Sequence, residues 1–293
     1  MNNKVVKNKI KKLYHQTLIS DNFYSLIILD AFKSIKGIDL KNDNTSLFDW
    51  TINYINRNTK SSSEYNFLKP DDSILPEAIS YFSLEAALLK KDYLESVKHA
   101  YYLSKVSEGT QIFEFLLEFS LIRCKESFKY IWHIFRMSVF FNNEFIFLSL
   151  CKMIQSIVND NYYEPSHIKN KTNINWKDYL SVENQNINDL LLYFSISNAK
   201  LIRSEKISKS ISHRIQRTKS HKNKELDEKL VYKEQRNLGR KWISNHLFKM
   251  DKKEYSFEII VLMNNIRSCL KLSKTKKEQE YFWMHLNLYL GKI

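Results

Sequence analysis

Turn-forming residues are scarce in this chain, which contains only four glycines and three prolines in 293 residues. An average soluble protein of this length would contain roughly 20 glycines and 15 prolines. Glycine supplies the positive φ angles that many turns need, and proline interrupts helices and sheets, so chains rich in tight turns use both. The scarcity therefore predicts few tight turns and long regular elements.

The same scarcity has a second explanation, which is an AT-rich coding sequence. Lysine outnumbers arginine 37 to 9, and asparagine, isoleucine, phenylalanine and tyrosine are abundant. Such a coding bias lowers glycine and proline without any structural cause. The prediction of fold class must therefore depend on the spacing of apolar residues more than on composition.

Apolar residues recur at helical spacing in most of the chain, which predicts an all-α protein. Four periodic segments follow one another with short connections, at 92–107, 110–123, 126–142 and 143–159. Short connections force successive helices to pack antiparallel, as in helical bundles and α-solenoids. Two more helices are expected at 257–272 and 276–290, and the aromatic residues of the second predict that it docks on the protein.

One predicted helical pair resembles a known repeat. The stretch Leu84–Ser107 includes Lys90-Lys-Asp-Tyr-Leu-Glu-Ser-Val-Lys-His-Ala100, and it resembles a single tetratricopeptide-type hairpin in its Asp-Tyr turn and the start of its second helix. It departs from that motif at Lys91, where a glycine is expected, and at Ser96, where an alanine is expected. The resemblance covers under a tenth of the chain and implies only a local helical hairpin.

The pattern predicts three parts: an N-terminal helical segment at 1–60, a central antiparallel array at 74–160, and a C-terminal helical region at 174–293. No window holds 18 uninterrupted apolar residues, and the N-terminal apolar run is too short for a signal peptide. We therefore expect no transmembrane segment and a cytoplasmic protein. The three widely spaced cysteines fit reduced thiols in that compartment.

The net charge of +14 is concentrated late in the chain. Residues 51–200 contain 16 basic and 17 acidic side chains, whereas residues 201–250 contain 14 basic and 5 acidic ones. Coding bias would spread lysine evenly, so this cluster favours a surface for an acidic partner, either nucleic acid or an acidic protein. The candidate binding residues are Lys206, Lys209, Arg214, Arg217, Lys219, Lys222, Lys224, Arg236, Arg240 and Lys241.

Within this basic stretch, Ile207, Ile211 and Ile215 fall at i, i+4 and i+8. This narrow apolar stripe predicts a helix that lies on the protein and presents cations on its flanks. Two readings without an acidic partner stay open, a solvated helix face and a disordered basic connector. A membrane surface is a lesser alternative, because the stripe lacks the tryptophan, phenylalanine and leucine that interfacial helices insert.

Metal chemistry is the alternative function. Glu95 and His99 share one face of a predicted helix, Glu114 and Glu118 share a face of the next, and His133 lies in the third. If these helices are neighbours, the groups could converge as in di-iron bundles and form a metal-dependent, oxidoreductase-like enzyme. The opposing interpretation makes His133 a core histidine with one satisfied nitrogen.

Phosphate-binding glycine loops and the nucleophile elbow are absent from the sequence. The leading hypothesis is a non-enzymatic helical scaffold that binds an acidic partner and needs no cofactor.

Overall fold

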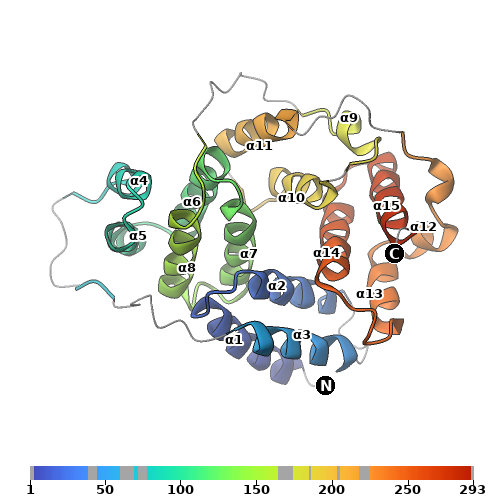
Figure 1. Ribbon diagram of the computed structural model, residues 1–293, viewed down its shortest axis with the longest axis horizontal. Helices are drawn as coiled ribbons and strands as arrows, with labels where there is room; N and C mark the ends of the chain where they lie inside the picture. Colours follow the sequence, from blue (N-terminus) through green and yellow to red (C-terminus); the bar gives the residue numbers. More distant parts are fainter. Residues whose placement is uncertain are drawn as a thin grey trace. The chain divides into compact units, whose positions relative to one another are not determined.

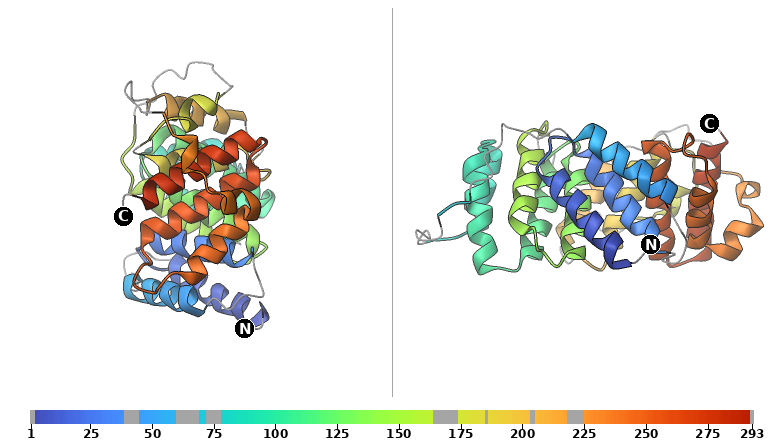
Figure 2. Two further views of the ribbon diagram at one scale, coloured as in Figure 1. Left: turned by 90° about the vertical axis from the view of Figure 1, so that its right-hand side faces the viewer. Right: turned by 90° about the horizontal axis from the view of Figure 1, so that it is seen from below.

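The structure is a computed structural model that describes residues 3–38, 45–59, 69–71, 78–163, 174–184, 186–202, 205–217 and 225–291. Within these ranges every regular element is a helix, as Figures 1 and 2 show. The β-type contacts in the same ranges are two isolated bridges, Cys124 with Tyr162 and Val182 with Glu225. The prediction of an all-α fold with packed helices is confirmed.

The chain divides into two compact units, each of which combines segments that are distant in the sequence. Unit 1 comprises Met1–Asn3, Ala31–Asn53 and Lys169–Ile293, and unit 2 comprises Lys4–Asp30 and Tyr54–Ile168. The division falls inside two N-terminal helices, α2 (Tyr24–Lys36) and α3 (Thr45–Asn58). The predicted parts 1–60, 74–160 and 174–293 follow the order of the chain, whereas the units do not.

Unit 2 contains most of α1 (Asn3–Leu18) and a run of helices with short connections. These are α4 (Tyr81–Leu89), α5 (Tyr93–Val106), α6 (Gly109–Arg123), α7 (Ser127–Phe140) and α8 (Ile146–Val158). Consecutive helices pack on one another, and α8 also packs on α5 and α6. The predicted array of sequential, packed helices is therefore present in this unit.

Positive φ angles occur in the short connections even though glycine is scarce. Lys91, Asn142 and Asn143 have φ angles of 57°, 50° and 58°. Asparagine tolerates this region well, whereas for lysine it costs roughly 1 kcal/mol or more. Lys91 occupies the position where the tetratricopeptide-type hairpin has glycine. Its Nζ donates to the Asp160 carbonyl at 2.6 Å and lies over the Tyr162 ring, and these contacts oppose the backbone cost.

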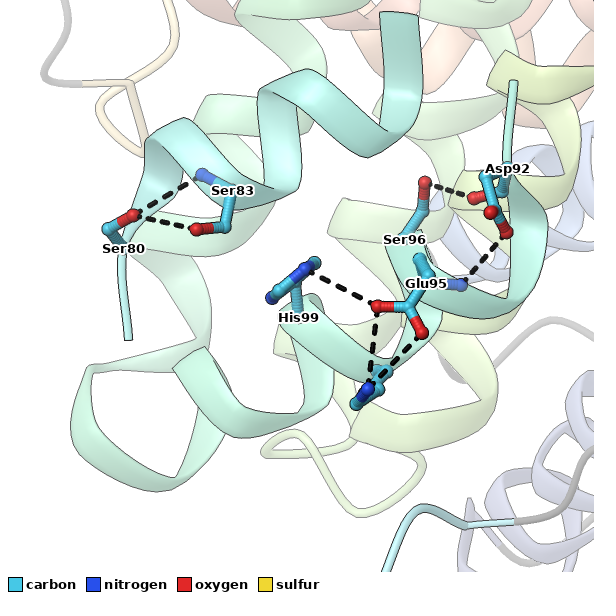
Figure 3. Close-up of polar contacts among 7 residues, drawn as sticks. Ser80, Ser83, Asp92, Glu95, Ser96 and His99 are labelled. Carbon is cyan, nitrogen blue, oxygen red and sulfur yellow. Dashed lines mark hydrogen bonds and ion pairs between the residues drawn. The ribbon is translucent and has the colours of Figure 1, made fainter. Parts of the chain in front are cut away.

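Side-chain caps begin both helices of the α4–α5 hairpin. The Ser80 hydroxyl accepts the Ser83 amide at the start of α4, and the Asp92 carboxylate accepts the Glu95 amide at the start of α5 (Figure 3). Such caps satisfy amides that have no partner within the helix. They explain why two helices can be separated by only three residues here.

Unit 1 is built around α14 (Phe257–Leu272), which packs on α10, α13 and α15. Its other helices after residue 169 are α9 (Lys177–Leu180), α10 (Ile187–Ser197), α11 (Glu205–Arg217), the 3-10 turn η1 (Glu228–Leu230), α12 (Lys233–Leu238), α13 (Arg240–Lys249) and α15 (Lys276–Leu290). The bounds of α14 and α15 agree with the predicted ranges. Phe282 and Trp283 of α15 are buried and make edge-on contacts with Phe194 and Trp242, so the last helix docks as predicted.

Candidate functional site

The basic helix α11 docks on unit 1 through its isoleucine stripe. Ile207, Ile211 and Ile215 are each 0% exposed. The helix packs on α10, which is buried over most of its surface and also contacts α14. The stripe is therefore a packing face, as its spacing predicted, and the flanks of α11 are left for polar side chains.

Three predicted binding residues lie on those flanks. Lys206 is exposed, and Lys209 and Arg214 are half-buried. Long basic side chains can cover apolar surface with their stems and keep the charge at the boundary with water. We call Lys206, Lys209 and Arg214 the α11 surface. Arg217 belongs to the last turn of α11, and Lys219, Lys222 and Lys224 lie outside the described residues.

The remaining predicted cations form a second group. Arg236 on α12 and Arg240 and Lys241 on α13 are all exposed, and Arg236 Nε lies 3.2 Å from Glu280 Oε1. Within unit 1, α11 lies beside α10, whereas α12 and α13 lie on the far side of α14 and α15 (Figure 1). This α12–α13 group therefore does not extend the α11 surface. The α11 surface and the α12–α13 group are therefore two separate groups of cations and not one patch.

The five candidate metal ligands are not assembled into one centre. Glu95 and His99 form an ion pair on α5 with Oε2 and Nε2 3.6 Å apart, and Lys98 also contacts Glu95 at 3.2 Å (Figure 3). Glu114 and Glu118 are half-buried on α6. Among the described residues there is no group of three or more histidine, cysteine, aspartate or glutamate side chains arranged to hold a metal. The convergence that the metal hypothesis requires is therefore not formed.

His133 belongs to a buried charged cluster that the sequence did not reveal. Its Nδ1 lies 2.7 Å from Asp30 Oδ2, and Arg136 Nη1 lies 3.3 Å from the same oxygen. Asp30 is 0% exposed and His133 is 2% exposed. An ionised carboxylate only accepts hydrogen bonds, so Nδ1 of His133 must be the donor. The interpretation of His133 as a core histidine is confirmed, and its partner is an aspartate from α2.

A second buried cation was also missed. Lys152 on α8 is fully buried, and its Nζ donates to the Ser20 carbonyl and to Gln155 Oε1, the latter at 2.9 Å. The ammonium lies 4.0 Å from the centre of the Phe23 ring. Burial lowers the pKa of Lys152 to about 8, although the charge of Asp21 acts in the opposite direction. The contact with Ser20 connects α8 to the segment that follows α1.

Both missed clusters had weak sequence signals. Asp30 is the single charged residue of the apolar run Leu26–Phe32, and Lys152 is the single charged residue of the mainly apolar run Ile146–Val158. A lone charge on a buried helix face requires a partner, since an unpaired buried charge is costly. The sequence therefore predicts that each charge has a partner but does not identify it, because Asp30 and His133, and likewise Lys152 and Ser20, lie more than 100 residues apart.

Comparison with protein-family models, curated proteins and solved structures found no match to this chain. In the parts of the chain that the structure describes, no helix combines the length and apolar character needed to cross a bilayer.

Proposed function

We propose that this protein is a helical scaffold that binds an acidic partner through the α11 surface. The observation that carries the proposal is the division of α11 into two faces, with a fully buried isoleucine stripe and basic side chains on its flanks. A packed stripe gives the helix a defined orientation, so its cations occupy defined positions relative to a partner. Phosphates on a nucleic acid fit such a row of cations with little dependence on base sequence.

The three cysteines support a reducing compartment for this function. Cys124, Cys151 and Cys269 are all buried, and each is a thiol that is not part of a disulfide. Burial raises the pKa of the Cys151 and Cys269 thiols to about 12, which makes them unreactive at neutral pH. A cytoplasmic scaffold, in which such thiols stay reduced, agrees with this chemistry.

Binding to short RNA and DNA of mixed sequence tests the proposal. Fluorescence anisotropy between about 50 and 200 mM salt should show an affinity that falls steeply with salt, as counterion release requires. The triple variant Lys206→Ala, Lys209→Ala, Arg214→Ala should bind at least about tenfold more weakly. The magnitude of the slope of log affinity against log salt concentration should also fall by about 3, one for each cation removed. The loss should be similar for all sequences tested.

The α12–α13 group offers a matched control. The variant Arg236→Ala, Arg240→Ala, Lys241→Ala removes the same number of cations from another side of unit 1 and should change affinity much less. Equal losses in the two triple variants would mean diffuse attraction and would contradict a site at α11. Polyglutamate serves as a probe for an acidic protein partner. If the protein binds polyglutamate but not nucleic acid, the α11 surface is assigned to a protein partner. No binding to either polyanion would reject the proposal.

A further inference from the structure

An apolar stripe is exposed along α4 in unit 2. Phe82, Ala86 and Leu89 are spaced at i, i+4 and i+7, so they share one face of the helix. Phe82 is 83% exposed and Leu89 is 44% exposed, and Ala86 is exposed between them. The other face of α4 is buried through Leu84, Ala87 and Leu88. Among the described residues, Phe82 is the most exposed large apolar side chain.

The position of α4 in its unit explains why the stripe is uncovered. Helix α4 packs chiefly on α5 and makes a smaller contact with α8, whereas α5 packs broadly on α8. The α4–α5 hairpin therefore lies at an edge of unit 2 (Figures 1 and 2), and α4 is the helix of the pair with less contact to α8. The outermost element of a stacked helical array normally carries a polar outer face. A phenylalanine exposed on such an outer face indicates a contact surface.

We propose that this face of α4 binds a second copy of the same chain. Phe82 and Leu89 lie about one helical turn on either side of Ala86, so the stripe is nearly symmetric about Ala86. A two-fold axis passing by Ala86 would pair two α4 helices antiparallel, with Phe82 of one copy against Leu89 of the other. The small side chain of Ala86 at the centre allows the two helices to approach closely. Such a self-complementary patch is what a two-fold interface requires.

Charge favours a second copy over other occupants. The segment 81–106, which comprises both helices of the hairpin, holds four basic and three acidic side chains, whereas the whole chain carries +14. The net charge of this hairpin is thus only +1, so two copies meet here with little repulsion between the hairpins, and a strongly acidic partner is attracted to the basic groups of unit 1 instead. In the antiparallel arrangement, Glu85 beside the stripe comes within reach of Lys90 of the other copy. The patch is thus complementary to itself in charge as well as in shape.

Sedimentation velocity over about 1 μM to 1 mM protein tests the proposal. An interface of one helical hairpin belongs to the small class, which forms transient complexes, so we expect a dimer that dissociates on dilution. The variant Phe82→Glu, Leu89→Glu should weaken dimerisation at least tenfold, because it places four carboxylates in the apolar contact. The matched control Val5→Glu changes an exposed apolar residue of α1 and should leave the dimer unchanged.

Disulfide trapping tests the symmetry directly. Ala86→Cys places a thiol next to the two-fold axis, where two β-carbons can approach to the roughly 4 Å that a disulfide needs. The native cysteines are buried, so mild oxidation should link only this position. We expect a covalent dimer from Ala86→Cys and none from Val5→Cys.

Three results would overturn the proposal. One is a monomer throughout the concentration range, and another is a dimer that survives Phe82→Glu, Leu89→Glu. The third is covalent linkage that is no greater for Ala86→Cys than for Val5→Cys. Circular dichroism of each variant confirms that the helical fold is retained, as expected for changes at exposed positions.

Discussion

Asp30 shows how a single buried charge constrains this protein. Its carboxylate has no exposed surface, and the groups that approach it include the imidazole of His133 and the guanidinium of Arg136. Removing a charge from water costs several kcal/mol, and this cost is offset only if the partners remain in place. The cluster joins α2 to α7 within unit 2, so its integrity is coupled to the packing of these helices.

Replacing Asp30 should therefore be strongly destabilising. We expect Asp30→Ala to lower the free energy of unfolding by about 3–5 kcal/mol, because it leaves His133 and Arg136 without their shared acceptor. Urea denaturation followed by circular dichroism measures the change. Asp49→Ala is the control, since Asp49 pairs with Lys252 at 3.5 Å on the surface and should cost less than about 1 kcal/mol. Similar losses in both variants would contradict a special role for the buried cluster.

His285 makes the stability of the protein depend on pH. Burial lowers the pKa of His285 from 6.5 to about 4, although the Leu180 carbonyl, which accepts from its Nε2 at 3.0 Å, acts in the opposite direction. Between these pH values the unfolded chain binds a proton that the folded chain does not. The contribution of His285 to stability is therefore complete above pH 6.5 and is lost as the pH falls toward 4.

The expected size of this loss is about 3 kcal/mol, because lowering a pKa by one corresponds to roughly 1.4 kcal/mol. His285→Gln retains an amide donor for Leu180 but cannot titrate in this range. We expect the unfolding free energies of wild type and His285→Gln to converge as the pH is lowered from 7 to 4. Parallel pH profiles for the two proteins, measured by urea denaturation, would show that His285 is not the titrating group.

At the scale of elements, Gly109 lies at a close contact between two helices. Gly109 begins α6, and a β-carbon at this position would lie within 2.4 Å of Cδ1 of Ile146, the first residue of α8. That separation is far shorter than a normal contact between carbon atoms. An alanine at 109 would therefore force the end of the Ile146 side chain to move. The constraint at Gly109 comes from this contact and not from a positive φ angle, which Gly239 has and Gly109 does not.

A double-mutant cycle isolates this contact. Gly109→Ala should lower the free energy of unfolding in both backgrounds, and the loss should be about 1–2 kcal/mol larger in the wild type than in the Ile146→Val protein. The reason is that valine lacks the Cδ1 atom that the new β-carbon would clash with. Thermal or urea unfolding of the four proteins provides the interaction energy. Additive effects within about 0.3 kcal/mol would show that the two helices adjust freely and that the approach is not constrained.

Helix α11 shows what an element can reveal from sequence alone. Its isoleucine spacing predicted a buried stripe, and the three residues are fully buried against the protein. The prediction succeeded because the face of a helix follows directly from residue spacing. The spacing could not reveal that the α12–α13 group lies elsewhere, because the turns between helices redirect the chain.

At the scale of the whole molecule, the net charge of +14 opposes folding through mutual repulsion. We expect added salt to raise the free energy of unfolding by on the order of 1 kcal/mol, because it screens exposed charges. Urea denaturation at about 10 and 150 mM sodium chloride measures this effect without adding a charged denaturant. The variant Lys206→Ala, Lys209→Ala, Arg214→Ala carries three fewer cations and should respond less. A midpoint that is independent of salt would show that attractive ion pairs already balance the repulsion.

The sequence by itself determined the elements of this protein. Helical spacing specified the all-α class, the bounds of α14 and α15, the buried stripe of α11 and the docking of the last helix. These features depend on residues within a few helical turns of one another, so a short stretch of sequence is enough to predict them. The same local pattern left two interpretations of His133 open, a metal ligand and a core histidine, and the buried position agrees with the second.

Only the tertiary structure decided which distant residues meet. Asp30 and His133 are separated by 103 residues, and Lys152 and Ser20 by 132. Glu95, Glu114 and His133, in contrast, belong to no group among the described residues that could hold a metal ion. The α11 surface and the α12–α13 group are near in sequence but apart in unit 1. The spacing of residues determines which face of a helix each residue occupies. Which helix packs against that face depends on how all the helices fit together in the core, and local spacing contains no information about this.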